Sequence, residues 1–322
     1  MRRVRYHSYG DPDVLRVEEA EIPAPGPGQV RLRTEVIGVN FVDSMFRRGM
    51  GAQFGRTLPA TLTGDVVGTV DAVGSDVDAA LLGRRVAALT EDAYADHVLA
   101  DAQWLADVPD GLDDAAATML SMVGPVALGS LRLGRVTPGT SVLVHAAAGG
   151  IGHLAVQLAK LLGAGTVIAT AGSPAKLDFA RGLGADIAID YTAADWPDQV
   201  RAALPNGVDV VLDSVGADVT RRGIDLLAPY GRLVAYGMAS GELTDVPIRS
   251  LYALRSVVGI SMLAWRTARP EEFTQAVTEI TDHLLAGRLR ATVHTELPLA
   301  DAVQAHQILD DRGQIGRILL RP

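Results

Sequence analysis

The sequence predicts an α/β fold in which a mostly-β domain is joined to a doubly wound parallel sheet. Short alternating or apolar runs broken by glycine and proline fill residues 1–120, and from about residue 121 apolar strands alternate with helical segments. With 322 residues and 48% hydrophobic content, the chain is long enough for two domains with separate cores. We expect residues 1–120 and 265–322 to form the mostly-β domain and residues 121–264 to form the parallel-sheet domain.

The mostly-β part is expected to begin with a strand, because valine and tyrosine alternate with arginine in Met1-Arg-Arg-Val-Arg-Tyr6. Pro23-Ala-Pro-Gly-Pro-Gly28 predicts a loop, since proline and glycine interrupt strands and helices. Alternating or apolar runs predict further strands at 30–36, 65–73 and 85–89.

The second part shows the alternation that is typical of parallel sheets with helices on both faces. Its predicted strands are 141–145, 166–170, 187–190, 208–213, 232–236 and 257–261. Residues 270–286 predict a long amphipathic helix, 300–309 a second helix and 315–320 a last strand. We expect this final stretch to pack on the first domain.

Composition excludes several classes of partner. The net charge is −9 and no long basic run is present, which disfavours nucleic acid or an anionic membrane as the main partner. No apolar stretch approaches the length of a membrane-spanning helix. The N-terminus lacks the apolar region and cleavage site of a signal peptide, so we expect a cytoplasmic location.

Residue types also limit the chemistry. The chain has no cysteine, which excludes disulfides, a thiolate nucleophile and cysteine-ligated zinc. None of the seven histidines pairs at His-x-His or His-Glu-x-x-His spacing, so they are interpreted as surface or core residues and no metal site is expected. Neither a Tyr-x-x-x-Lys pair nor a Gly-x-Ser-x-Gly motif is present. Any catalysis therefore depends on a cofactor.

A glycine-rich turn, His145-Ala-Ala-Ala-Gly-Gly-Ile-Gly152, joins a predicted strand to a predicted helix. Ala147, Gly149 and Gly152 hold the places of the three glycines in the dinucleotide-binding pattern. In that pattern, phosphates face backbone N–H groups at the positive end of a helix dipole. The strand–turn–helix context favours a dinucleotide site over a plain connector.

The next segment indicates which dinucleotide is bound. About 20 residues after the glycine turn, an NAD-binding domain places an acidic residue on the ribose 2′-hydroxyl. Here the chain reads Ala171-Gly-Ser-Pro-Ala-Lys176, with no acidic residue. Lysine occurs only at positions 160 and 176. We predict that Lys176 binds a 2′-phosphate and that the cofactor is NADPH, with a solvated lysine on a helix face as the alternative.

These motifs combine with three others, Gly38-Val-Asn-Phe-Val-Asp43 followed by Arg47-Arg-Gly49, Asp213-Ser-Val-Gly216 and Gly316-Arg317. Over the whole chain, their order resembles the zinc-independent medium-chain reductases of the quinone oxidoreductase, or zeta-crystallin-like, family. The resemblance implies a GroES-like mostly-β catalytic domain and a Rossmann NADPH-binding domain. It also implies a homodimer, with a sheet edge near 257–262 as its interface.

The resemblance implies that Asn40 lies by the nicotinamide, Lys176 and Tyr191 near the adenosine 2′-phosphate, and Ser214, Gly237 and Arg317 along the cofactor cleft. Asn40 is also the candidate hydrogen-bond donor to the acceptor oxygen, unless it only forms a turn that closes a strand. Ser44 and Tyr252 are weaker candidate donors. The predicted cofactor-binding residues are Asn40, Ala147, Gly149, Gly150, Ile151, Gly152, Gly172, Ser173, Lys176, Tyr191, Ser214, Gly237 and Arg317.

Departures from the family pattern leave the substrate open. Met45 stands where several quinone reductases have a tyrosine, and Pro125 replaces a threonine that often faces the nicotinamide. The leading hypothesis is an NADPH-dependent reductase of a small-molecule quinone or similar conjugated carbonyl. Its rival is an enoyl reductase acting on an α,β-unsaturated carbonyl or thioester. A third hypothesis is an NADPH-binding module without turnover.

Overall fold

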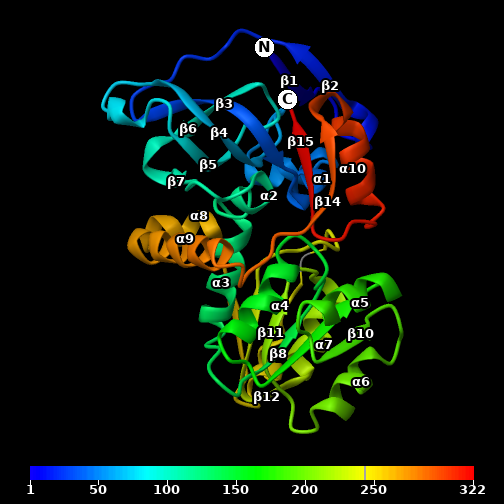
Figure 1. Cartoon of the computed structure of the whole chain (residues 1–322). Helices are drawn as coiled ribbons and strands as arrows, with labels where there is room; N and C mark the ends of the chain where they lie inside the picture. Colours follow the sequence, from blue (N-terminus) through cyan, green and yellow to red (C-terminus); the bar gives the residue numbers. More distant parts are fainter. Residues whose placement is uncertain (243) are drawn as a thin grey trace. The chain divides into compact units, whose positions relative to one another are not determined.

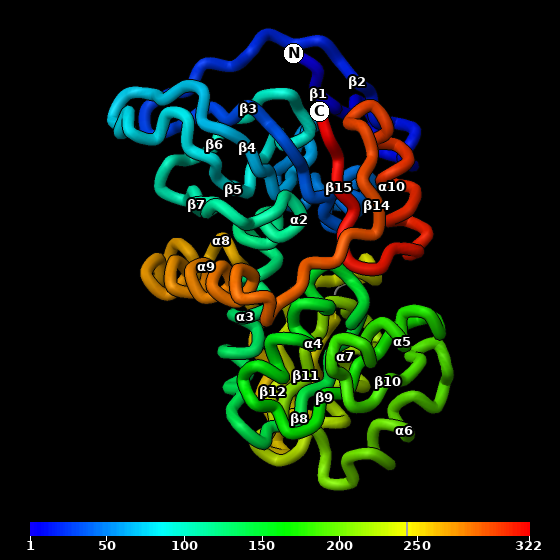
Figure 2. The backbone as a smooth tube through the Cα atoms, in the orientation of Figure 1, coloured from blue at the N-terminus to red at the C-terminus, as the bar shows by residue number. Residues whose placement is uncertain are grey.

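The chain forms two compact units in the computed structural model, which describes residues 1–242 and 244–322. The first unit comprises residues 1–122 and 291–322, and the second comprises residues 123–290. In Figure 2 the chain can be followed from one unit into the other and back. One unit is mostly β and the other is built on a parallel sheet, so the predicted fold class is confirmed.

The first unit contains a seven-stranded sheet in the order β14-β15-β3-β4-β5-β7, with β6 paired to β3, and a separate hairpin of β1 and β2 (Figure 1). Its strands are β1 Arg2–Tyr6, β2 Leu15–Glu19, β3 Gln29–Gly38, β4 Gly64–Val73, β5 Arg85–Thr90, β6 His97–Asp101, β7 Ala106–Asp107, β14 Val293–Pro298 and β15 Arg317–Arg321. Its α-helices are α1 Phe41–Arg47, α2 Asp114–Ala117 and α10 Ala302–Asp310.

The long strand β3 organises this unit. Val30, Leu32 and Val36 alternate along it and are fully buried, as a strand with one face on a core requires. The C-terminal strand β15 runs antiparallel to it, with Leu319 opposite Gly38. The last 32 residues therefore complete a sheet that the first 107 begin, although residues 108–290 separate them in the chain.

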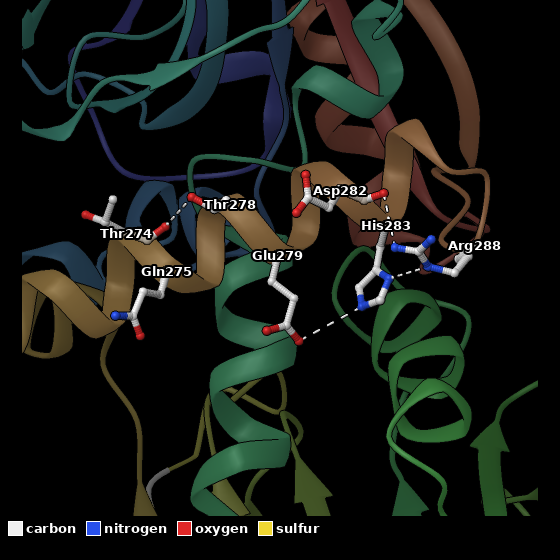
Figure 3. Close-up of a pocket in the computed structure, with 7 residues that line it drawn as sticks. All are labelled: Thr274, Gln275, Thr278, Glu279, Asp282, His283 and Arg288. Carbon is white, nitrogen blue, oxygen red and sulfur yellow. Dashed lines mark hydrogen bonds and ion pairs between the residues drawn. The ribbon is translucent and has the colours of Figure 1, made fainter.

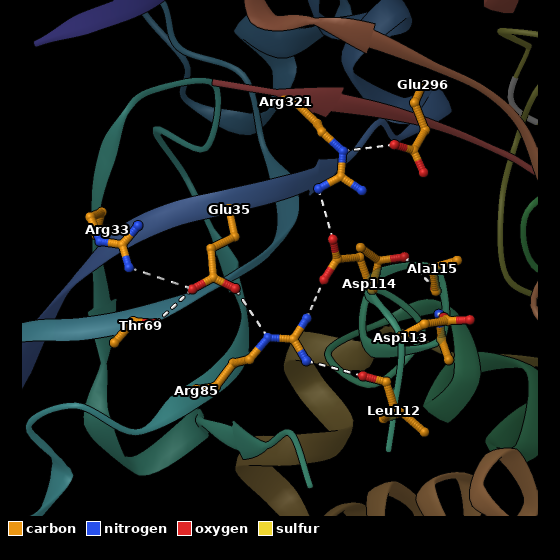
Figure 4. Close-up of polar contacts among 12 residues, drawn as sticks. Arg33, Glu35, Thr69, Arg85, Leu112, Asp113, Asp114, Ala115, Glu296 and Arg321 are labelled. Carbon is orange, nitrogen blue, oxygen red and sulfur yellow. Dashed lines mark hydrogen bonds and ion pairs between the residues drawn. The ribbon is translucent and has the colours of Figure 1, made fainter. Parts of the chain in front are cut away.

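Ion pairs on the surface of the first unit join the same segments (Figure 4). Arg85 of β5 donates through Nε to Glu35 of β3 at 3.0 Å and also pairs with Asp114 of α2. Arg321 of β15 donates to Asp114 at 2.7 Å and to Glu296 of β14 at 2.7 Å. Each exposed pair contributes at most about 1 kcal/mol, but the network holds the C-terminal strands in register with the N-terminal sheet.

The second unit has a six-stranded parallel sheet in the order β10-β9-β8-β11-β12-β13. Strand order reverses between β8 and β11, which is the doubly wound pattern of a dinucleotide-binding sheet. Its strands are β8 Ser141–Val144, β9 Thr166–Ala171, β10 Ile187–Asp190, β11 Val208–Asp213, β12 Leu227–Ala235 and β13 Ser256–Gly259. Its helices are α3 Val123–Leu133, α4 Gly152–Leu161, α5 Pro174–Gly182, α6 Trp196–Ala203, α7 Ala217–Asp225, α8 Met262–Ala268 and α9 Pro270–Leu285.

Helix α9 matches the predicted amphipathic helix, but its location differs from the expectation. Residues 265–290 belong to the second unit, where α9 packs against α3 and α8. The rings of Phe273 on α9 and Trp265 on α8 meet edge to face, with centroids 5.4 Å apart. Trp265 in turn fills the space above Gly129 of α3, where an added Cβ would lie 2.7 Å from the ring. This packing requires glycine on α3 and fixes α8 on it.

The polar side of α9 carries a surface pocket whose lining is drawn in Figure 3. Within it, Arg288 Nε donates to His283 Nδ1 at 2.9 Å, and His283 lies 3.9 Å from Glu279. Glu279 also pairs with Arg132 of α3. These groups stabilise the end of the helix and its contact with α3, and no predicted cofactor residue lines the pocket. In the part of the chain that is described, no helix is both long and apolar enough to cross a membrane.

Candidate active site

The glycine-rich turn connects β8 to α4 as predicted. The N–H of Gly149 donates to the carbonyl of Ala146 at 2.9 Å, which closes the turn. A Cβ added to Gly152 would overlap the Ala146 carbonyl oxygen and lie 2.9 Å from the Cα of Ala147. Gly152 therefore allows the close approach of helix and strand, which is the role of the third glycine in the dinucleotide pattern.

A second loop, at the end of β11, lies beside the point where strand order reverses. The buried carboxylate of Asp213 accepts hydrogen bonds from the N–H groups of Val215 at 2.7 Å and Gly216 at 3.2 Å. These bonds shape the loop that carries Ser214. A Cβ on Gly237 would lie 3.0 Å from the Ser214 carbonyl oxygen. The structure thus brings the predicted residues Ser214 and Gly237 together.

The predicted 2′-phosphate residues gather at the ends of β9 and β10, which are paired with Asp190 opposite Ala171. The hydroxyl of Tyr191 lies 3.3 Å from the position that a Cβ on Gly172 would take. Ser173 is the N-cap of α5, yet its side chain makes no capping hydrogen bond, so its hydroxyl is not used by the helix. Lys176, half-buried, follows in the first turn of α5.

In the first unit, Asn40 is the N-cap of α1, and its side chain makes no capping hydrogen bond either. Its Oδ1 accepts from Arg317 Nη2 at 3.1 Å. Its Nδ2 is buried and has no acceptor among the described residues. The alternative in which Asn40 only closes a turn does not account for this arrangement, because its side chain bonds to Arg317 and makes no capping bond to α1.

Arg317 is turned into the first unit. Besides Asn40, its guanidinium donates to Asp65 at 2.8 Å and to the carbonyl of Thr118 at 3.2 Å, and only 2% of the residue is exposed. Ser121 Oγ donates to the other oxygen of Asp65 at 2.5 Å. The expectation that Arg317 lines the cofactor cleft does not fit this burial, since the guanidinium is already bound to protein groups.

Sequence reasoning missed Asp65 and Ser121. The only signal for Asp65 was a carboxylate at the start of the apolar run 65–73, where a buried strand has no ordinary place for a charge. No local pattern could give its partner, because Asp65 and Arg317 are 252 residues apart.

The two weaker candidate donors lie in unsuitable places. Ser44 is fully buried, and its hydroxyl donates to the Phe41 carbonyl at 3.0 Å within α1. It has no free donor because a serine inside a helix readily bonds to the preceding turn. Tyr252 is 77% exposed and follows a short 3-10 helix, Ile248–Leu251. Neither placement suits a donor in a site from which water is excluded.

Comparison with known proteins agrees with this geometry. Residues 26–110 match the alcohol dehydrogenase GroES-like domain, and residues 150–282 match the zinc-binding dehydrogenase family. A quinone oxidoreductase of Pseudomonas aeruginosa is 36% identical over 333 residues, covering 100% of this chain and 99% of the relative. The chain belongs to the quinone oxidoreductase family, the zinc-independent branch of the medium-chain dehydrogenases and reductases.

Other relatives show the range of this family. A 2-haloacrylate reductase of Burkholderia is 36% identical, covering 98% of this chain and 97% of the relative. The Escherichia coli quinone oxidoreductase complexed with NADPH superposes with a TM-score of 0.92 and 31% identity, each chain covered fully. A mycobacterial protein complexed with NADPH superposes with a TM-score of 0.93 at 35% identity, again over both whole chains.

The donor set of this family member does not fit a zinc ion. The chain has no cysteine, and the described residues contain no group of three His, Asp or Glu side chains placed to hold a metal. Of the histidines, His145, His153 and His306 are fully buried. His145 Nδ1 lies 2.8 Å from Thr170 Oγ1, and His153 Nδ1 lies 2.9 Å from the Gly149 carbonyl. These three histidines are core residues, which is one of the two roles that the sequence leaves open for the histidines.

The first arginine of the Arg47-Arg-Gly49 motif, Arg47, has a structural role. Arg47 is completely buried and pairs with Asp310 at 2.5 Å, which ties α1 to α10. Its Nε donates to His306 Nδ1 at 3.4 Å, so the His306 proton is on Nε2, 3.3 Å from the Tyr94 hydroxyl. Burial, together with the Arg47 charge, lowers the pKa of His306 to about 3. His306 is therefore neutral at physiological pH.

Asp43, in the first turn of α1, is a completely buried carboxyl group. It accepts hydrogen bonds from the Thr63 N–H and hydroxyl, both at 2.8 Å. Burial raises its pKa to about 7, and the Thr63 hydrogen bonds and the Arg56 charge oppose that rise only in part. The pKa in the unfolded chain is the ordinary 3.8, so the folded protein holds this proton more tightly.

We therefore expect Asp43 to reduce the free energy of unfolding as pH rises from about 4 to about 7, by at most about 1.4 kcal/mol per pH unit. Below pH 4 both states bind the proton, and the full stabilising contribution is present. Asp43→Asn, which keeps an acceptor for the Thr63 N–H, removes this dependence. The free energy of unfolding, measured with denaturant at several pH values between about 4 and about 7, tests this prediction. If it changes with pH in the same way for the wild type and for Asp43→Asn, the pKa of Asp43 is not raised.

Proposed function

We propose that this chain is an NADPH-dependent oxidoreductase that transfers hydride to a quinone or a similar conjugated carbonyl without zinc. The observation that carries the proposal is the amide of Asn40, whose Nδ2 is buried and unpartnered among the described residues. A buried donor without an acceptor costs about 1–3 kcal/mol, which a bound ligand recovers by accepting the hydrogen bond. The quinone oxidoreductases and NADPH complexes among the relatives support both the cofactor and the reaction.

The second unit supplies the cofactor contacts in this proposal. The turn around Gly149, Gly150 and Ile151 would bind the pyrophosphate through backbone N–H groups, which need no charged side chain. Lys176 and the Ser173 hydroxyl would bind the 2′-phosphate as charged and neutral donors. The remaining proposed cofactor contacts are Ala147, Gly152, Gly172, Tyr191, Ser214 and Gly237.

When bound, NADPH supplies the hydride. The chain has to hold the acceptor, exclude water and stabilise the oxygen that gains negative charge. We assign the last role to Asn40, whose amide N–H donates to that oxygen. Met45 and Pro125 carry no acidic proton, and we assign the proton that completes the hydroquinone to solvent.

A second candidate is reduction of a carbon–carbon double bond conjugated with a carbonyl or carboxylate. The 2-haloacrylate reductase, 36% identical over nearly the whole chain, supports it. The same amide of Asn40 would then stabilise an enolate oxygen. The two reactions share the hydride and differ in which acceptor atom receives it.

A substrate panel tests the proposal. Initial rates of NADPH oxidation are compared for a simple quinone, an enone, an enoyl thioester and a 2-haloacrylate, with product analysis for each. The proposal expects the highest kcat/KM with the quinone and hydroquinone as the product. Turnover confined to the alkenes would replace it with the second candidate.

We also propose a homodimer formed through the edge of the parallel sheet. Strand β13 pairs with β12 and has no second strand partner among the described residues. Five exposed apolar residues fall in β12, in the segment before β13 and in α8, and they are Tyr230, Ile248, Tyr252, Leu254 and Leu263. Exposed apolar residues that gather into one patch are typical of an interface. Light scattering is expected to give twice the 33.8 kDa chain mass, and a monomeric mass would refute the dimer.

The cytoplasmic location stays a prediction.

A further inference from the structure

The buried ion pair of Arg317 and Asp65 contacts Asn40, the side chain on which the proposed reaction depends. Both side chains are inaccessible, at 1% and 0% exposure. A guanidinium carries only donors, so the Asn40 atom that faces Arg317 has to be the carbonyl oxygen. The Asn40 Nδ2–H group is consequently directed away from Arg317. It has no acceptor there among the described residues.

The backbone is built to admit this arginine. A Cβ on Gly38 would lie 2.7 Å from Arg317 Cζ, so any other residue at position 38 would displace the guanidinium from this position. Gly316 precedes Arg317 with a φ of 75°, a conformation that favours glycine, and a Cβ added there would overlap the Thr292 carbonyl oxygen. These two constraints explain why Gly38 and Gly316 accompany Asn40 and Arg317 in the sequence motifs.

Asp65 fixes the arginine in turn. Ser121 donates to one carboxylate oxygen at 2.5 Å while Arg317 occupies the other at 2.8 Å. The Thr118 carbonyl accepts a further Arg317 N–H at 3.2 Å. With three acceptors around it, the guanidinium has a single orientation, and the amide of Asn40 follows from it.

We propose that Arg317, held by Asp65, is a positioning residue that orients the amide of Asn40 with its N–H toward the acceptor oxygen. This inference rests on the proposed function of Asn40. In the absence of Arg317 the amide is free to turn, and in half of its orientations it presents Oδ1, which repels a developing negative charge. Arg317 itself makes no contact with the cofactor in this proposal.

Arg317→Lys is the first test, because lysine keeps the charge opposite Asp65 but loses the fork that reaches Asn40. We expect kcat to fall about 10- to 100-fold, since small errors in positioning have effects of that size. The Kd of NADPH, measured by fluorescence, is expected to change less than about threefold because the cofactor contacts are in the second unit. Arg321→Met, four residues along the same strand, serves as the control and leaves kcat unchanged.

A second variant guards against misfolding. Arg317→Met combined with Asp65→Asn removes both charges, so no unpaired charge stays buried. It is expected to melt cooperatively and to show the same loss of kcat. When Asn40→Ala is already present, neither Arg317→Lys nor the double variant is expected to lower kcat further. The residue through which Arg317 acts is then gone.

A spectroscopic measurement tests the orientation without turnover. The chain has only two asparagines, Asn40 and Asn206, so asparagine-selective ¹⁵N labelling gives two side-chain amide signals. NADPH is expected to shift the Asn40 signal in the wild type and to shift it much less in Arg317→Lys, with exposed Asn206 as the internal reference.

The outcomes separate the two proposals. A wild type that oxidises no NADPH with any acceptor refutes the proposed function, while the amide signals still test the positioning role. A large loss of NADPH affinity in Arg317→Lys would make Arg317 a cofactor ligand, and an equal loss of kcat in the Asn40→Ala background would make its role structural. An unchanged kcat, or an Asn40 signal insensitive to NADPH in the wild type, also overturns the inference.

Discussion

Asn40→Ala is expected to lower kcat about 10²- to 10³-fold, the effect of removing one oriented donor from a site without water. The Kd of NADPH is expected to change little, because the pyrophosphate and 2′-phosphate contacts are assigned to the second unit. Single-turnover oxidation of bound NADPH measures the hydride step directly. Arg317 keeps Asp65 and the Thr118 carbonyl as acceptors in this variant, so the fold is expected to survive.

Asn206→Ala is the matched control for this prediction. Asn206 is the only other asparagine, and it lies exposed in the turn before β11. A kcat within about twofold of wild type is expected for it, as for surface substitutions in general. If Asn40→Ala retains full kcat, the acceptor oxygen is stabilised by another group and the assignment of Asn40 is wrong.

Lys176→Ala is expected to weaken NADPH binding about 10- to 100-fold and NADH binding less than about threefold. The difference arises because only NADPH carries the 2′-phosphate, and a charge-assisted hydrogen bond to phosphate contributes about 1.5–3 kcal/mol. Titration of both dinucleotides by fluorescence gives the two ratios.

The chain offers a matched control here as well. Lys160, the only other lysine, pairs with Asp186 at 3.1 Å on the surface of the same unit. Lys160→Ala removes one positive charge from the same unit and is expected to leave both affinities unchanged. An equal loss of NADPH and NADH binding in Lys176→Ala would show that Lys176 supports the loop rather than the 2′-phosphate.

The parallel-sheet unit was predictable because its signals are local. Each strand is a short apolar run, and the requirement for glycine at Gly152 follows from a contact with Ala146 only six residues away. The placing of α9 was not predictable in this way. The apolar face of α9 predicts that the helix packs on another element, but it does not say which one. Packing on α3 and α8 depends on Gly129, which leaves space for the Trp265 ring.

The observed site differs from the predicted one because some of its contacts join residues that are far apart in the sequence. Asn40 was identifiable from its motif, but the contact that orients it comes from a strand 277 residues away. The same motif includes Ser44, and the sequence gives no sign that its hydroxyl is used within α1. A family motif therefore finds the residues of a site, whereas the direction in which each side chain faces depends on the packing around it.

The most direct test of the central claim is acceptor-dependent oxidation of NADPH by the purified full chain, followed by nicotinamide absorbance with a simple quinone and with NADH as the control. The account predicts steady oxidation of NADPH that depends on quinone concentration and is much slower with NADH. Tight NADPH binding with no oxidation in the presence of quinones, enones or enoyl thioesters would contradict it and favour a binding module without turnover.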